Sequence, residues 1–240
     1  MVGLTFYVSR VTLLLPAAVT TRALNEIEAK RLLADAGVMV TLTELAPTAD
    51  TAAATARRLG FPVALKIVSP DITHKSDVGG VRLGLATADA VSVAFAEIVS
   101  AARARQPQAR IDGVAVQPMA PPDGVEVIVG VSVDPQFGHV IMCGLGGILV
   151  EVLRDVAFRL IPLQPRDARQ MLAELRGAAL LRGGRGRAGV DLAKLEALLL
   201  HVSRLIERRP DIRELDLNPI LAYPDRVIAV DARALVAVAS

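Results

Sequence analysis

Glu214-Leu215-Asp216-Leu217-Asn218-Pro219-Ile220, near the C-terminal end of this 240-residue chain, is the segment that says most about its fold. Acidic and amide residues alternate with leucines here, and side chains at i and i+2 lie on the same face of a β-strand. The segment therefore predicts a strand whose leucines face a core, with Asp216 and Asn218 together on the other face. Pro219 lacks a backbone donor and is predicted to end the strand.

The oxygen atoms of Asp216 and Asn218 indicate a candidate metal site. Two adjacent oxygen ligands suit Mg²⁺, because this ion keeps several waters and usually shares its coordination shell with nucleotide phosphates. A strand end with a polar rim is the alternative interpretation, and the spacing alone does not decide between the two.

The composition indicates a globular chain with a sizeable core. Hydrophobic residues make up 52% and aromatic residues 3%, so alanine, valine and leucine fill the interior. A net charge of +2 is too small to indicate a nucleic-acid partner. Cys143 is the only cysteine, which excludes an internal disulfide and a cysteine-rich metal site and fits a cytoplasmic protein.

The N-terminal residues are interpreted as an extension. The apolar stretch 11–19 is interrupted by Pro16 and is far shorter than a membrane span, so no membrane association is predicted. Only Arg10 is charged ahead of this short run, which argues against a signal peptide. Residues 1–22 are expected to be a linker or an N-terminal extension.

Periodicity and turn residues predict a mixed fold. Helices are expected at residues 25–36, 48–59, 88–103, 167–175 and 192–206, and strands at 38–40, 62–68, 81–85, 113–117, 125–133, 140–143, 214–217 and 227–230. Several of these strands look antiparallel, which favours an α+β fold with α/β-like alternation over a doubly wound sheet. The proline cluster at 118–122 is the best candidate for a hinge between a small lobe, 23–117, and a large lobe, 118–240.

The first of these helices looks amphipathic. Ile27, Leu32 and Leu33 lie roughly on one face, and the charged residues lie elsewhere on the helix: Glu26, Glu28, Lys30 and Arg31.

Lys66 is the single charged residue in the apolar strand 62–68. A lysine in such a run is rarely buried without a partner, and a phosphate or a carboxylate would offset the cost of burying it. The alternative is an edge strand from which the lysine reaches solvent.

The loop that follows combines His74 and Lys75 with hydroxyl residues and the paired glycines Gly79 and Gly80. Glycines let backbone amides approach phosphate oxygens, and histidine acts as a base or as a nucleophile toward phosphorus. An ordinary loop histidine is the alternative, and the adjacent glycines and lysine favour function.

Two further segments carry weaker signals. Gly144, Gly146 and Gly147 do not have the spacing of a dinucleotide-binding motif, and they precede the charged series Glu151, Asp155 and Arg159, whose spacing also suits a solvated helix face. Arg185, in a glycine- and arginine-rich loop, is interpreted either as a phosphate clamp or as part of a flexible basic loop.

Together these features resemble the ATP-grasp fold and, more narrowly, the ATP-grasp part of the ADP-forming acyl-CoA synthetases. The resemblance extends over residues 23–235. It is carried by the segments 25–30 (NEIEAK), 60–66 (GFPVALK), 69–81 (SPDITHKSDVGGV), 124–130 (GVEVIVG) and 214–219 (ELDLNP). The run His74-Lys75-Ser76-Asp77-Val78-Gly79-Gly80 is its specific element, because other ATP-grasp proteins lack it.

The resemblance implies a two-lobed protein that binds ATP or ADP with Mg²⁺ between its lobes. It implies the following roles: phosphate contact for Lys66, a frame around the adenine for Gln117, Pro118 and Met119, a ribose or lobe contact for Glu126, and Mg²⁺ binding for Asp216 and Asn218. His74 matches the histidine that relays phosphate in this family, with Lys75 beside it and Arg185 as a clamp. A histidine in the CoA-binding part takes a phosphoryl group from an acyl phosphate, and the ATP-grasp part passes it to ADP.

The CoA-binding part of that family is missing from this sequence, so a CoA-binding α-type subunit or domain is the expected partner. Arg187-Ala188-Gly189 also stands where the family loop usually has prolines. Two other functions remain open: an ATP-grasp ligase that forms an acyl phosphate without a phosphohistidine, and a nucleotide-binding regulatory module without catalytic activity.

Overall fold

The computed structural model describes residues 20–72, 74–147, 154–184, 186 and 188–238. The chain divides into two compact units: unit 1 comprises residues 1–23, 31–40 and 122–240, and unit 2 comprises residues 24–30 and 41–121. The division passes through α2 (Glu26–Asp35) and again between Pro121 and Pro122. The three-part division expected from the sequence stays a prediction.

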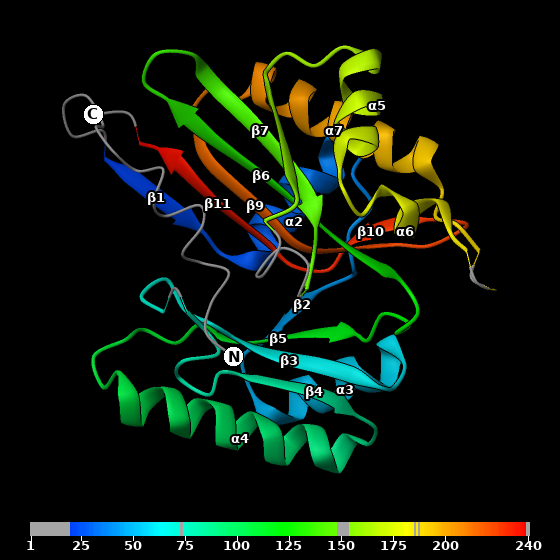
Figure 1. The fold of residues 1–240 in the computed structure, drawn as a ribbon. Coiled ribbons are helices and arrows are strands. Elements are labelled where there is room, and N and C mark those ends of the chain that lie inside the picture. Colours follow the sequence, from blue (N-terminus) through cyan, green and yellow to red (C-terminus); the bar gives the residue numbers. More distant parts are fainter. Residues whose placement is uncertain (1–19, 73, 148–153, 185, 187, 239–240) are drawn as a thin grey trace. The chain divides into compact units, whose positions relative to one another are not determined.

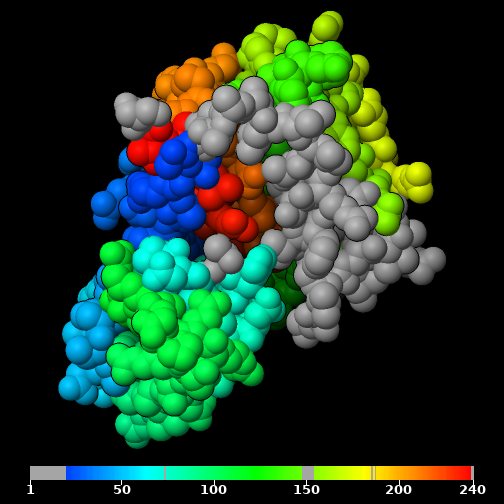
Figure 2. Space-filling view, turned by 90° about the vertical axis from the view of Figure 1, so that its left-hand side faces the viewer, coloured from blue at the N-terminus to red at the C-terminus, as the bar shows by residue number. Residues whose placement is uncertain are grey.

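Among its described residues, unit 2 forms a four-stranded antiparallel sheet in the order β2-β5-β3-β4. Its elements are β2 (Glu44–Ala46), α3 (Ala49–Leu59), β3 (Val63–Val68), β4 (Val81–Leu85), α4 (Ala88–Arg105) and β5 (Gly113–Pro118). Both helices cover the same face of this sheet (Figure 1). Figure 2 shows the end of α4 and the segment after it, in green, on the surface of unit 2. The helix predicted at 48–59 is confirmed, with Thr48 as its N-cap.

The alternation of strand side chains separates an apolar face of this sheet from a polar one. Leu65 and Ile67 belong to the core under α3 and α4, together with Val114 and Val116 of the neighbouring strand. Lys66 alternates with the two β3 residues, so its side chain leaves on the opposite face. Because β3 lies between β5 and β4, Lys66 is on a central strand, and the edge-strand alternative is wrong.

The described residues of unit 1 contain a seven-stranded sheet in the order β1-β11-β9-β6-β7-β8, with β10 also paired to β9. Its elements are β1 (Thr21–Leu24), β6 (Val125–Asp134), β7 (Gly138–Leu145), β8 (Val156–Leu160), α5 (Pro165–Glu174), α6 (Ala178–Arg182), α7 (Leu192–Arg208), β9 (Ile212–Ala222), β10 (Val227–Ala229) and β11 (Ala232–Ala237). The predicted pairing of the strands at 125–133 and 140–143 is confirmed, because β6 and β7 pair antiparallel.

Strand β9 confirms the alternation expected from its sequence but not its predicted end. Leu215 and Leu217 are buried, and the residues between and after them are partly exposed. The prediction that Pro219 ends the strand is wrong, because β9 continues to Ala222. Val127 pairs with Ile220 and Val129 with Leu217, so two residues of β9 lie opposite one residue of β6. This bulge accommodates a proline, because no ladder hydrogen bond is required from its nitrogen.

Two other segments differ from the sequence predictions. Residues 38–40 form only an isolated bridge, between Val40 and Ala229, rather than a strand. The helix face suggested for the series around Asp155 is wrong, because residues 156–160 form strand β8. The Asp155 carboxylate instead accepts 2.7 Å hydrogen bonds from the backbone N–H groups of Arg176 and Gly177. Glu151 lies outside the described residues.

In the part of the chain that the structure describes, no helix has both the length and the apolar character needed to span a bilayer.

The packing around Gly80 predicts a sharp loss of stability on adding a side chain. A Cβ atom there would lie 2.5 Å from Ile67 Cγ2 and 2.8 Å from the Lys75 carbonyl oxygen. We expect Gly80→Ala to lower the free energy of unfolding by about 2–3 kcal/mol, measured by urea titration. Gly84→Ala is the control: Gly84 has a φ of 71° but open surroundings, so we expect a loss of about 1 kcal/mol. An equal loss in both variants would contradict the packing argument.

Candidate functional site

The start of α2 places two charged residues inside unit 2. Glu26, Ala29, Lys30 and Leu33 are buried, and their spacing i, i+3, i+4, i+7 defines one helix face. The expectation that Glu26 and Lys30 lie elsewhere on the helix than Leu33 is wrong, because all three are buried on this face. Sequence reasoning missed both as site residues, although a Glu–Lys pair four residues apart inside segment 25–30 was an available signal.

The Glu26 carboxylate forms ion pairs with lysines from separate elements. Its Oε1 atom accepts hydrogen bonds from Lys66 Nζ of β3 at 2.7 Å and from Lys30 Nζ at 2.9 Å. Its Oε2 atom accepts one from Lys75 Nζ, in the loop after β3, at 2.5 Å. The Glu26 side chain is 1% exposed. Of the two partners expected for Lys66, a phosphate or a carboxylate, the structure shows a carboxylate, that of Glu26.

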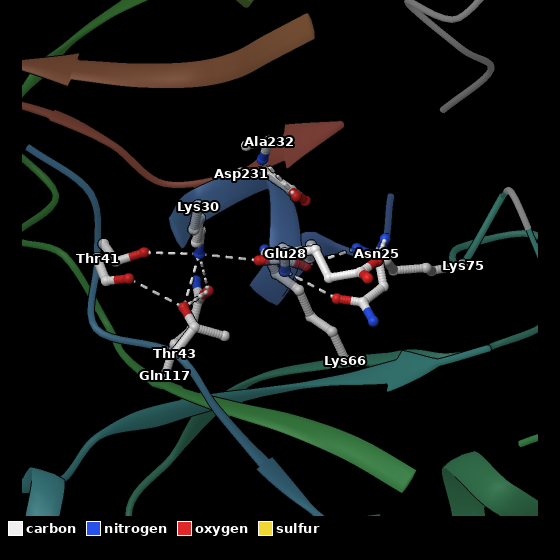
Figure 3. Close-up of polar contacts among 11 residues, drawn as sticks. Asn25, Glu28, Lys30, Thr41, Thr43, Lys66, Lys75, Gln117, Asp231 and Ala232 are labelled. Carbon is white, nitrogen blue, oxygen red and sulfur yellow. Dashed lines mark hydrogen bonds and ion pairs between the residues drawn. The ribbon is translucent and has the colours of Figure 1, made fainter. Parts of the chain in front are cut away.

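Lys30 extends this network to strand β5. Its Nζ atom lies 2.8 Å from Thr41 Oγ1, 2.7 Å from Thr43 Oγ1 and 2.8 Å from Gln117 Oε1 (Figure 3). Because an ammonium group only donates, the oxygen of the buried Gln117 amide must face Lys30. The Glu26 cluster is defined here as Glu26, Lys30, Thr41, Thr43, Lys66, Lys75 and Gln117.

Electrostatics inside the cluster favour the ionised carboxylate. Burial by itself raises the pKa of Glu26, but the positive charges of Lys66, Lys75 and Lys30 outweigh burial and bring its pKa well below its usual range. Glu26 is therefore an anion near neutral pH.

The loop between β3 and β4 presents His74 to solvent. His74 is exposed, and its carbonyl oxygen accepts a hydrogen bond from Asp77 N at 3.2 Å. The amide of Gly79 donates to Ser76 O at 3.0 Å and that of Gly80 to Lys75 O at 2.7 Å. The glycine amides thus close the loop in this structure. Contact between these amides and phosphate stays a prediction.

The other residues expected at the nucleotide site lie on several elements. Pro118 is the last residue of β5, and Met119 N donates to Pro62 O at 2.9 Å. Glu126, at the start of β6, is exposed, and its carbonyl oxygen accepts a hydrogen bond from Gly146 N at 2.7 Å. Arg185 lies outside the described residues.

In unit 1, Asp216 and Asn218 lie on one face of β9. Burial, the largest cause, and the negative charges of Asp231 and Glu214 outweigh the positive charge of Arg233 and together raise the pKa of Asp216 to about 6. A carboxylate surrounded in this way favours a bound cation or a proton.

Asp216 and Asn218 on β9 offer Mg²⁺ two oxygen ligands. No group of three or more His, Cys, Asp and Glu side chains among the described residues is arranged to hold a metal ion. Mg²⁺ commonly uses only one or two protein oxygens and completes its shell with water and phosphate, which matches the pair Asp216 and Asn218.

Comparison with known proteins identifies the family of this chain. A family model described as the ATP-grasp domain matches residues 17–236. The chain belongs to the ATP-grasp family. The ADP-forming acetate–CoA ligase II subunit beta of Pyrococcus furiosus is 44% identical over 214 residues, which cover 88% of this chain and 90% of that protein. The ADP-forming acetate–CoA ligase I of Archaeoglobus fulgidus is 45% identical over 197 residues, 82% of this chain but 28% of that protein.

Solved structures show the same relationship for this ATP-grasp chain. The acetyl-coenzyme A synthetase 1 of Ca. Korarchaeum cryptofilum, in complex with coenzyme A, Ca-AMPCP and HgCl+, matches with a TM-score of 0.86 and 44% identity, covering 90% of this chain and 93% of that chain. A second structure of that synthetase, with coenzyme A and Mg-AMPPCP, matches with a TM-score of 0.78, 41% identity and the same coverage. It has its phosphohistidine segment pointing towards the nucleotide binding site. The expected ATP-grasp fold, α+β with antiparallel sheets, is thus confirmed.

The buried contacts of Lys30 make it a stability determinant of this ATP-grasp chain. We expect Lys30→Met to lower the free energy of unfolding by about 2–4 kcal/mol, because it removes one cation from a buried network and leaves Gln117 Oε1 without that donor. Guanidinium titration would measure the loss. Lys194→Met is the matched control: the Lys194 side chain is 53% exposed in its pair with Asp191, and we expect a change below about 1 kcal/mol. Equal changes would show that the buried network adds nothing.

The raised pKa of Asp216 predicts a pH-dependent gain in stability on neutralising it. The folded-state pKa of about 6 exceeds the ordinary value of 3.8, so the stability linked to this group is complete below about pH 4 and lost as the pH rises through 6. With EDTA present, we expect Asp216→Asn to unfold with a free energy about 1–2 kcal/mol higher than the wild type at pH 8, and with no difference near pH 4. A gain that is the same at both pH values would contradict this assignment.

Proposed function

We propose that this chain is the nucleotide-binding subunit of an ADP-forming acyl-CoA synthetase and that it carries a phosphoryl group between His74 and ADP or ATP. The observation that carries the proposal is the exposed His74, adjacent to a lysine that is held by the Glu26 carboxylate together with Lys66. The loop after β3 thus offers His74 as a nucleophile. Lys75 of the same loop and Lys66 of β3 offer cations suited to phosphate oxygens.

The proposal assigns the other site residues to nucleotide and metal. Lys66 contacts the phosphates, and the segment Gln117–Met119 contacts the adenine. Asp216 and Asn218 bind Mg²⁺, which when bound offsets the negative charge of the phosphate oxygens. The Mg-AMPPCP complex of the Korarchaeum synthetase supports a magnesium nucleotide as the ligand.

The transfer step is a displacement at phosphorus. In the direction of ATP formation, a β-phosphate oxygen of ADP attacks the phosphorus carried by a ring nitrogen of His74. The O–P bond forms as the N–P bond breaks, and the electron pair of the N–P bond returns to the ring nitrogen. A proton on the other ring nitrogen leaves the imidazole neutral, and the reverse sequence phosphorylates His74 from ATP.

The proposal also requires a CoA-binding partner. The Archaeoglobus relative aligns with this chain over 28% of its own length. The Pyrococcus relative is named as a beta subunit. A separate α-type subunit that binds CoA and delivers the phosphoryl group is therefore the expected partner, with acyl-CoA, ADP and phosphate giving carboxylate, CoA and ATP.

The phosphoryl relay can be tested on this chain alone. Incubation with Mg²⁺ and ATP labelled at the γ-phosphate should give an acid-labile, base-stable phosphoprotein, because phosphohistidine has these properties. We expect His74→Ala to abolish the label while the affinity for nucleotide changes less than about twofold, since the exposed ring adds little to binding in the ground state. His139→Gln, at a histidine bonded to Ile212 O, is the control and should label normally.

The outcome also separates the two other functions. Full activity of the reconstituted complex with His74→Ala would favour a ligase that forms an acyl phosphate without a phosphohistidine. Nucleotide binding without any label in the wild type would favour a regulatory module. Either result would overturn the proposed relay.

A further inference from the structure

Within the described residues of unit 2, the Glu26 carboxylate binds both Lys66, the lysine proposed to contact phosphate, and Lys75, in the loop that carries His74. Lys66 comes from the middle of β3 and binds Oε1 at 2.7 Å, whereas Lys75, the neighbour of His74, binds Oε2 at 2.5 Å. The two lysines are nine positions apart in sequence, with the loop between them. One rigid carboxylate therefore fixes the distance between their ammonium groups.

Burial holds the Glu26–Lys66 contact more closely than the Glu26–Lys75 contact. The side chains of Glu26 and Lys66 are 1% and 7% exposed, so water does not compete for their contact, whereas that of Lys75 is 24% exposed. In a buried pair the geometry is held closely, because breaking it leaves a charge without compensation. The Lys75 contact is the more accessible of the two and the one next to the reacting histidine.

We propose that Glu26 is a positioning residue for phosphoryl transfer, holding Lys66 for the nucleotide phosphates with one oxygen and the His74 loop, through Lys75, with the other. The inference rests on the proposed function. Glu26 touches neither nucleotide nor phosphoryl group; it acts through the two lysines. It sets where the nucleotide phosphates and the relay loop lie with respect to each other.

Only a carboxylate can hold two lysines in this way, with one charged acceptor oxygen for each. Each oxygen accepts from a different ammonium group, and both acceptors carry negative charge. A glutamine has one acceptor and one donor, so its NH₂ group would repel whichever lysine faces it. An aspartate keeps both acceptors on a side chain that is one methylene shorter.

Three variants separate the contact of Glu26 with Lys66 from its contact with Lys75, called here the loop link. Glu26→Gln removes the negative charge from both lysine contacts and leaves a single acceptor for two ammonium groups, so we expect the Kd for Mg-ADP to rise about tenfold and the rate of His74 labelling at saturating Mg-ATP to fall about a hundredfold. Lys75→Met loses only the loop link, so we expect labelling to fall about tenfold while the Kd changes less than about twofold. Glu26→Asp should recover part of the labelling rate.

A double-mutant cycle tests whether Glu26 acts through Lys75. In the Lys75→Met background, the labelling rate at saturating nucleotide should lose less to Glu26→Gln than it does in the wild type, because the loop link is already absent. Glu44→Gln, which removes a carboxylate from the exposed Glu44–Arg58 pair of the same unit, is the matched control and should change neither Kd nor rate. Isothermal calorimetry gives the Kd, and rapid quench gives the rate.

The result that overturns the inference differs from the result that overturns the relay. If the wild type labels and Glu26→Gln, folded by circular dichroism, labels at the wild-type rate with the wild-type Kd, Glu26 does not position the lysines. Fully additive effects in the cycle would equally reject action through Lys75. If Glu26→Gln does not fold, the folded Glu26→Asp and Lys75→Met variants decide: the inference fails if both label at the wild-type rate. If the wild type does not label, the relay itself fails and this inference fails with it.

Discussion

The buried carboxylate of Glu26 is the interaction on which the rest of unit 2 depends. Burying an isolated carboxylate costs several kcal/mol, and burying an isolated ammonium group costs a similar amount, so neither is stable in the interior alone. At Glu26 the two costs offset each other, because Lys30 and Lys66 approach the same oxygen atom. Lys30 then orders Gln117, so the first turn of α2, the middle of β3 and the end of β5 are held by one set of charges.

The sheet of unit 2 makes this arrangement possible because its two faces carry different chemistry. Leu65 and Ile67 anchor β3 to the core beneath α3 and α4, which fixes the strand without any contribution from its polar side. Lys66, between them, therefore projects from a strand that is already anchored, which suits the phosphate contact proposed for it. A lysine on a loop would reach the same place only by losing much more side-chain and backbone freedom.

The sequence predicted those features that depend on local patterns. The alternation in β9 placed Asp216 and Asn218 on one face, and the lone charge of Lys66 in an apolar strand predicted a charged partner for it. The Glu26–Lys30 spacing marks a pair but does not by itself indicate burial, because a Glu–Lys pair at i, i+4 is typical of an exposed helix surface. Only the packing of α2, which buries Ala29 and Leu33 on the same face, turns that pair inward. The end predicted at Pro219 failed because a bulge in the neighbouring strand pair removes the need for its donor.

The continuation of β9 past Pro219 affects the two residues proposed to bind Mg²⁺, Asp216 and Asn218. If the strand ended there, Asn218 would lie at a fraying terminus. Instead Asp216 is paired on both sides, with Gly130 of β6 and Arg233 of β11, and Asn218 N donates to Asp231 O at 3.3 Å. Mg²⁺ demands near-ideal octahedral geometry and tolerates little movement of its ligands. Side chains that project from the middle of a paired strand meet that demand better than side chains on a loop. The bulge thus lets a proline follow the acid–amide pair without loosening the strand that carries it.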